Sequence, residues 1–100
     1  MPPSEEFIRS VIDESDKEFK TQKDIRKGSI RVEIETPFKL LKAIDDGYGN
    51  IVGNRISGTV DYDERVIIVS LVDKVDNQPV TVFFKEPNSI EDPFITEMRL

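Results

Sequence analysis

The property that most constrains this chain is its excess of β-branched apolar side chains. Ile and Val make up 22 of the 100 residues, whereas Leu, Met and Ala together make up 7. Branching at Cβ stiffens χ1, which disfavours helices slightly and suits the pleated surface of a sheet. A chain of this length buries about two-thirds of its unfolded surface in one core. The sequence therefore predicts one domain, residues 1–100, in which strands dominate.

The N-terminal segment is the expected exception, with a helix over residues 5–21. Ser4 is a good N-cap, and acidic residues follow it at the positive end of the helix dipole. Gly28 is a natural stop after the basic end of this segment. Apolar side chains recur at helical spacing and predict a stripe that packs on a sheet, formed by Phe7, Ile8, Val11, Ile12 and Phe19.

After this segment the apolar pattern changes to a period of two. Ile30, Val32 and Ile34 alternate with charged residues, which predicts a half-buried strand. Residues 38–44 fit either a short helix or a strand that enters a hairpin, and we favour the strand. The Asp- and Gly-rich residues 45–50 predict the turn that follows.

The remaining residues are predicted to form a meander. A sheet of such strands has an apolar face to bury, and so does the predicted helix. The two apolar faces are therefore expected to pack against each other. The predicted fold class is therefore α+β: an N-terminal amphipathic helix packed on a small, strongly bent antiparallel sheet or β-barrel of about four to six strands. The expected elements are a segment over 51–63 with bulges or a bend at Gly53 and Gly58, a turn at 63–65, a central strand at 66–72 covered on both faces, a turn at 76–79, a strand at 80–85, and a strand or helical turn at 94–100.

Composition and charge exclude several classes of function. The chain has no Cys and no His, which excludes disulfides, a thiolate nucleophile, a Ser-His-Asp triad and an ordinary zinc site. The formal net charge of −6 disfavours nucleic acid and anionic membranes as partners. We find no signal peptide and no apolar run of the ~20 residues that cross a bilayer. The expected location is cytoplasmic or virion-associated.

Two acidic segments could bind a divalent cation. Asp61 and Asp63 lie on one face of a strand and Glu64 follows, and carboxylate oxygens suit Mg²⁺ or Ca²⁺. The favoured alternative is a solvated turn, because a metal site needs several converging ligands. Residues 45–50 have the composition of a calcium loop but lack its ligand spacing, so a plain turn is favoured there too. We therefore predict no metal site.

Four residues are the candidate partner-binding positions: Tyr48, Lys20, Lys23 and Lys27. Tyr48 lies on a Gly-flanked loop, where an aromatic side chain either contacts a partner or folds back on the sheet. The three lysines belong to a basic cluster over residues 17–27 and would share one helical face. They could bind phosphate or RNA, and the favoured alternative is that they complement the helix dipole.

These features favour a non-catalytic protein–protein interaction or structural subunit, a component of a larger, viral or phage-like assembly. The expected partner is another protein or a second copy of the chain, met at an exposed strand edge or at the Tyr48 loop. We predict no catalytic residue, no cofactor and no small-molecule substrate, since no nucleophile is paired with a base. The alternative is a small-barrel nucleic-acid-binding protein that uses the basic end of the N-terminal helix.

Overall fold

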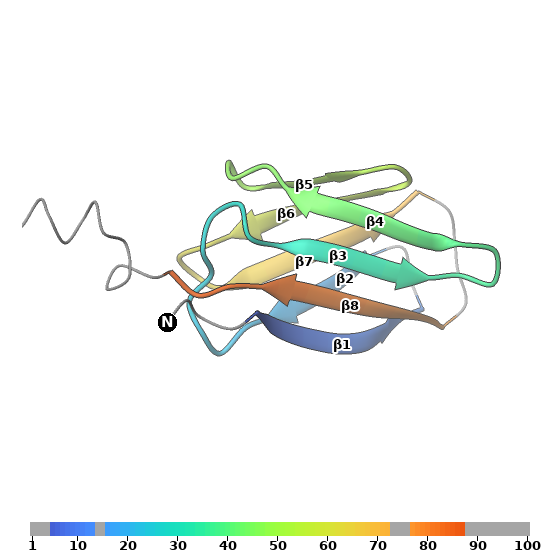
Figure 1. The fold of residues 1–100 in the computed structure, drawn as a ribbon, viewed down its shortest axis with the longest axis horizontal. Coiled ribbons are helices and arrows are strands. Elements are labelled where there is room, and N and C mark those ends of the chain that lie inside the picture. The colour runs from blue at the N-terminus through green and yellow to red at the C-terminus, as the bar shows by residue number, and fades with distance from the viewer. Residues whose placement is uncertain (1–4, 14–15, 73–76, 88–100) are drawn as a thin grey trace, which may run out of the picture.

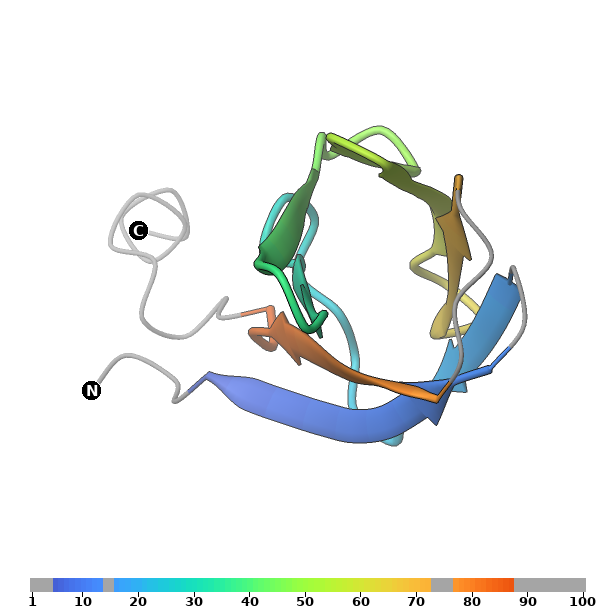
Figure 2. The same ribbon diagram turned by 90° about the vertical axis from the view of Figure 1, so that its right-hand side faces the viewer.

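Eight antiparallel strands form one sheet that curls into a nearly closed barrel (Figures 1 and 2). A computed structural model of the chain describes residues 5–13, 16–72 and 77–87. The order of the strands around the barrel is β1-β8-β3-β4-β5-β6-β7-β2. The strands are β1 (Glu6–Ile12), β2 (Asp16–Lys20), β3 (Arg31–Glu35), β4 (Leu40–Asp45), β5 (Asn50–Gly53), β6 (Ile56–Asp61), β7 (Val66–Leu71) and β8 (Gln78–Phe84).

The predicted α+β class and its N-terminal helix over 5–21 are wrong. No helix occurs in the described residues, and the predicted helical segment holds strands β1 and β2. In β1, Ile8 and Ile12 point inward while Phe7 and Val11 point outward. Apolar residues on both faces of a strand give the same spacing as a helical stripe, which is why the pattern misled. The barrel itself agrees with the sequence-based expectation, with eight strands rather than four to six.

A crossing segment, residues 21–30, joins β2 to β3 across one end of the barrel (the cyan loop in Figure 1). Its apolar residues Ile25 and Ile30 are buried in the core. The backbone N–H of Arg26 donates to the Lys85 carbonyl oxygen at 2.8 Å, which fixes the segment to the end of β8. Gly28, expected to stop a helix, instead adopts a left-handed turn with φ of +81°.

Strands β3 to β7 form a meander of four consecutive hairpins, in agreement with the period of two. Residues 40–45 form a strand, as favoured, and the turn at 45–50 and the turn after Asp61 are present. The bend expected at Gly53 is a complete hairpin between β5 and β6. Strand β7 pairs on both sides, with β6 and β2, but its outward residues are half-buried rather than covered. Residues 73–76 and 94–100 lie outside the described part of the chain.

The core fills the inside of the barrel with β-branched side chains. Inward residues alternate with outward ones along most strands, as in other small barrels. No described side-chain nitrogen or oxygen atom is both buried and without a hydrogen-bond partner. The largest fully buried side chains are Ile12, Ile30, Ile34, Ile51, Ile56, Ile67, Val32, Val69, Val80 and Val82.

Candidate interaction surface

The barrel has one seam, where the first and last strands of the sheet, β1 and β2, face each other without pairing in the strand order. Each of the two strands pairs on one side only, β1 with β8 and β2 with β7. A hollow of about 330 Å³ lies at the seam, between the start of β1 and the end of β2. Its lining comprises Glu6, Phe7, Ile8, Lys20, Gln22, Lys23 and Phe84.

An ion pair between Lys23 and Glu6 bridges this hollow. Lys23 Nζ lies 2.6 Å from Glu6 Oε1, and both side chains keep contact with solvent. The hydrogen bond and the charge of Glu6 raise the pKa of Lys23 above its ordinary value. An exposed ion pair of this kind contributes little to stability. At this end of the seam, the ion pair therefore holds β1 less firmly than the hydrogen-bonded ladder that joins β1 to β8.

The outward face of β1 is apolar at both ends and basic in the middle. Phe7 is 65% exposed and Val11 is 44% exposed, with Arg9 between them. The Phe7 ring contacts the Phe83 ring of β8, at a centroid distance of 6.3 Å. We call Phe7, Arg9, Val11 and Phe83 the β1 face. The expectation that Phe7 and Val11 pack into the core is wrong, because β1 turns these side chains outward. Phe19 is buried, at 4% exposure.

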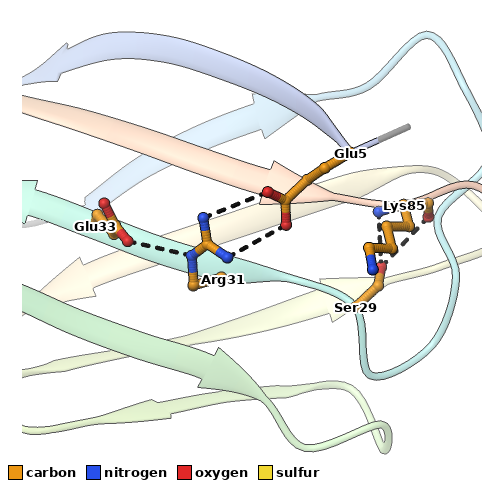
Figure 3. Close-up of polar contacts among 5 residues, drawn as sticks. All are labelled: Glu5, Ser29, Arg31, Glu33 and Lys85. Atoms are coloured by element: carbon orange, nitrogen blue, oxygen red, sulfur yellow. Dashed lines mark hydrogen bonds and ion pairs between the residues drawn. The ribbon is translucent and has the colours of Figure 1, made fainter. Parts of the chain in front are cut away.

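Charged side chains surround the aromatic pair of the β1 face. The Arg31 guanidinium lies 4.1 Å from the centre of the Phe83 ring. It donates to both carboxylate oxygens of Glu5, at 3.3 and 3.4 Å, and to Glu33 at 3.2 Å (Figure 3). Arg9 reaches over β8 to Glu35 at 3.2 Å. The acidic and basic side chains around the β1 face are therefore paired with one another. The groups of this surface that remain available to a partner are mainly the apolar ones.

A buried carboxylate organises the loops at the end of the barrel closed by the crossing segment. Asp45 is 5% exposed and accepts N–H groups from Gly28 at 2.7 Å and Gly47 at 2.8 Å. It also accepts the Tyr62 hydroxyl, which in turn accepts the Gly49 N–H at 3.2 Å. Burial and the hydrogen bond to Asp45 raise the pKa of Tyr62 from 10.0 to about 12. These hydrogen bonds connect the crossing segment, the β4–β5 hairpin and the β6–β7 turn.

Neither the Asp45–Tyr62 pair nor the β1 face follows from a local pattern in the sequence. Asp45 and Tyr62 lie 17 positions apart, and each stands in a segment that composition alone explains as a turn. Phe7 and Phe83 meet only because β1 pairs with β8. One feature of the sequence does indicate β1. Phe7 and Ile8 are adjacent apolar residues, and adjacent residues of a strand lie on opposite faces, so this pair fits a strand with two apolar faces.

The four predicted partner-binding residues fall into two pairs. Lys20 and Lys23 lie at the seam. Lys27 and Tyr48 line a separate hollow of about 370 Å³ beside Tyr62. Lys27 Nζ is 5.7 Å from the centre of the Tyr62 ring, and Tyr48 is 89% exposed at the tip of the β4–β5 hairpin. The single basic helix face is therefore wrong, since these residues occupy a strand and a loop.

Basic residues do gather at one place. A hollow of about 430 Å³ at the end of the crossing segment is lined by four bases, Arg26, Lys27, Arg31 and Lys85, and by two acids, Glu5 and Asp45. Both acids already have partners: Glu5 binds Arg31, and Asp45 binds the loops. This basic hollow is formed from residues that are far apart in the sequence.

The two acidic segments form turns in the structure. Asp61 Oδ1 accepts the backbone N–H groups of Asp63 and Glu64, at 3.1 and 3.0 Å. Asp46 Oδ1 accepts those of Tyr48 and Asn50, at 2.7 and 3.2 Å, and the Tyr48 bond is the largest cause of the lowered pKa of Asp46. Among the described residues, no three His, Cys, Asp or Glu side chains gather in a way that could hold a metal ion.

Comparison with protein-family models, with curated proteins and with solved structures found no match to this chain. Within the described residues, no helix has the length and apolar character needed to cross a membrane. The candidate surface therefore rests on geometry and chemistry alone.

Proposed function

We propose that this chain is a non-catalytic interaction subunit that docks another protein through the β1 face. The observation that carries this proposal is the exposure of Phe7. The Phe7 side chain, on β1, is 65% exposed, and its ring contacts the ring of Phe83 on β8. Exposed aromatic side chains with arginines beside them are typical of the central residues of protein interfaces. A structural role within a larger assembly uses the same surface.

The polar groups beside Phe7 and Phe83 suit a protein partner. A second hollow, of about 260 Å³, lies over β1, β8 and β3 and is lined by Phe7, Phe83, Thr81, Arg9, Glu33 and Glu35. Its two acids and one base are poor ligands for a phosphate backbone, and its two rings are suited to an apolar side chain. Polar groups at its margin can hydrogen-bond to a peptide backbone, as the rims of protein interfaces do.

Site-specific photo-crosslinking tests this proposal. A benzophenone amino acid replaces Phe7 in one variant and Phe38, an exposed residue of the β3–β4 hairpin, in the control. Both variants are expressed in the cells that naturally make the chain. We expect a discrete crosslinked protein from position 7 and none from position 38. Equal crosslinking from both positions, or none from position 7, would contradict the proposal.

The basic hollow favours one second candidate, a nucleic-acid-binding barrel. Its four bases outnumber its two acids although the whole chain carries −6. Affinity for duplex DNA that depends on several phosphates falls steeply with salt, with a log–log slope of about −0.9 per phosphate. Fluorescence anisotropy with mixed oligonucleotides at physiological salt separates the candidates. Submicromolar binding that is lost in Arg26→Glu/Lys85→Glu would favour this second function.

A further inference from the structure

We propose that the basic hollow binds a small molecule through its phosphate group. The hollow, of about 430 Å³, is lined by none of the residues of the β1 face, so this inference does not depend on the proposed docking role. Its volume falls within the range of about 300–1,000 Å³ that is typical of small-molecule sites. Lys27, for which the sequence left phosphate binding open, is one of its bases.

The two acids that line the hollow do not neutralise it. Glu5 holds Arg31 through both carboxylate oxygens, at 3.3 and 3.4 Å, so these two charges cancel each other (Figure 3). Asp45 is 5% exposed, and its oxygens accept the N–H groups of Gly28 and Gly47. Its charge offsets one of the other three bases, and the hollow keeps a net charge of +2.

These three bases are Arg26, Lys27 and Lys85. Within the described residues, none of them forms an ion pair with a carboxylate. Lys27 lies over the Tyr62 ring, a contact that leaves its positive charge in place. A phosphate group carries about −1.5 to −2 charges near pH 7 and offers three acceptor oxygens, which suits several cationic donors placed together. The planar guanidinium of Arg26 can bind two of these oxygens at once.

Backbone hydrogen bonds hold Arg26 and Lys85 next to each other. The Arg26 N–H donates to the Lys85 carbonyl oxygen at 2.8 Å, and the Lys85 N–H donates to Ser29 Oγ at 3.0 Å. Gly28, two positions after Arg26, turns the chain with φ of +81° and donates to Asp45 at 2.7 Å. The backbone that carries these bases is therefore fixed before a ligand arrives, which lowers the entropy cost of binding.

Charge outside the hollow favours a compact ligand over a nucleic acid. The hollow carries +2 and the whole chain −6, so the rest of the chain carries −8. A nucleic acid bears phosphates along its whole length, and those beyond the hollow would meet this acidic remainder. A small molecule presents its phosphate inside the hollow only. The 61% exposed Ile44 also lines the hollow and offers an apolar contact to the rest of such a ligand.

Titration with inorganic pyrophosphate tests this inference. The probe is added to the whole chain at physiological salt, which screens attraction between distant charges, and amide NMR spectra record the result. We expect saturable chemical-shift changes concentrated in residues 26–31 and 85. Tricarballylate, a tricarboxylate of similar charge, is expected to bind more weakly, because its charges are spread over three separate carboxylates. Equal binding of the two anions would contradict the choice of a phosphate.

Variants with one positive charge fewer locate the site. Arg26→Gln and Lys85→Gln are each expected to weaken pyrophosphate binding about ten-fold or more, because a hydrogen bond to a charged group is lost. Lys39→Gln is the matched control, since Lys39 is an exposed base of the β3–β4 hairpin, at the other end of the barrel. Its dissociation constant should stay within about two-fold of the wild type. All three side chains are exposed, so the variants should fold as the wild type does.

Several results would overturn the inference. One is the absence of saturable binding at millimolar pyrophosphate, and another is a set of shifts confined to strands away from the hollow. Equal weakening in Lys39→Gln would mean attraction by overall charge rather than a site. Tighter binding of a mixed oligonucleotide than of pyrophosphate, with the same dependence on Arg26 and Lys85, would identify nucleic acid as the occupant and reject the small molecule. None of these results affects crosslinking from position 7, which tests the docking role separately.

Discussion

At the scale of single residues, one buried carboxylate fixes the geometry of three loops. Asp45 accepts hydrogen bonds from Gly28, Gly47 and Tyr62, which come from the crossing segment, the β4–β5 hairpin and the β6–β7 turn. A buried charge is tolerated only when such partners replace water. The cluster therefore positions both Tyr48 and the basic hollow, whichever of them a ligand uses.

Tyr62→Phe is expected to lower the stability of the barrel by about 1–3 kcal/mol, because it leaves Asp45 with one donor fewer. The effect should depend on pH. The pKa of Tyr62 is about 12 in the folded chain against 10.0 in the unfolded one, so the unfolded chain loses this proton first. The stability that Tyr62 contributes is thus complete below pH 10.0 and is lost as the pH rises towards about 12.

Urea unfolding of the wild type and of Tyr62→Phe across this alkaline range measures the difference. Titration of lysines affects both proteins alike and cancels in the comparison. The gap between the two stabilities should narrow as the pH rises. A constant gap would contradict the Asp45–Tyr62 hydrogen bond. Absorbance titration of Tyr48→Phe, in which Tyr62 is the remaining tyrosine, gives its pKa directly.

Two phenylalanines of the N-terminal region should respond very differently to truncation. Phe19 is 4% exposed, so Phe19→Ala is expected to cost about 3–5 kcal/mol. Phe7 is 65% exposed and contacts one ring, so Phe7→Ala should cost only about 0.5–1.5 kcal/mol. Denaturant midpoints of the two variants measure this contrast. Equal losses would contradict the outward position of Phe7 on β1.

At the scale of elements, the sequence predicted the meander well and the N-terminal strands badly. Strand β3 has apolar residues on one face only, so its period of two is unambiguous. In β1, outward Phe7 and Val11 and inward Ile8 and Ile12 together imitate a helix. The partner that decides between the two readings is β8, about 70 positions away, and no local pattern contains that information.

The candidate surface was predictable only in kind. The sequence predicts an exposed strand edge, and β1 is paired on one side only, but the helical interpretation places residues 7 and 11 in the core. Lys20 and Lys23 do lie at the seam, although on a strand and a loop rather than on a helix. The sequence does not predict that residues 21–30 cross the end of the barrel. They do so because β2 pairs with β7 whereas β3 pairs with β8 and β4, and this pairing is not contained in any local pattern.

Gly58 is the glycine on which strand packing depends most directly. A Cβ atom at this position would lie 2.0 Å from the carbonyl oxygen of Ile68 on β7. Gly58→Ala must push β6 and β7 apart, and we expect a loss of about 1–3 kcal/mol or more. Ser57→Ala, at the exposed neighbouring position, should change stability by less than about 0.5 kcal/mol. Thermal unfolding of both variants tests this, and equal stabilities would show that the strands do not approach so closely.

At the scale of the whole molecule, the barrel combines a local and a non-local half. Strands β3 to β7 pair only through consecutive hairpins within the meander, whereas β1 and β3 both pair with β8, and β2 pairs with β7. Closing long loops costs chain entropy before the new contacts form. The two strands at the seam are therefore attached by distant pairings along the chain, which places the seam in the part of the barrel expected to form last.

This organisation predicts the order of folding. Ile51→Val lies in the middle of the meander and Val82→Ala lies in β8, and both side chains are fully buried. If the meander forms first, Ile51→Val should mainly slow folding, and Val82→Ala should mainly speed unfolding. Stopped-flow chevron plots measure both rates, and folding of such a non-local barrel is expected within milliseconds to seconds. The reverse pattern would mean that β8 pairs with β1 and β3 before the meander forms. The strands on either side of the seam would then form early rather than late in folding.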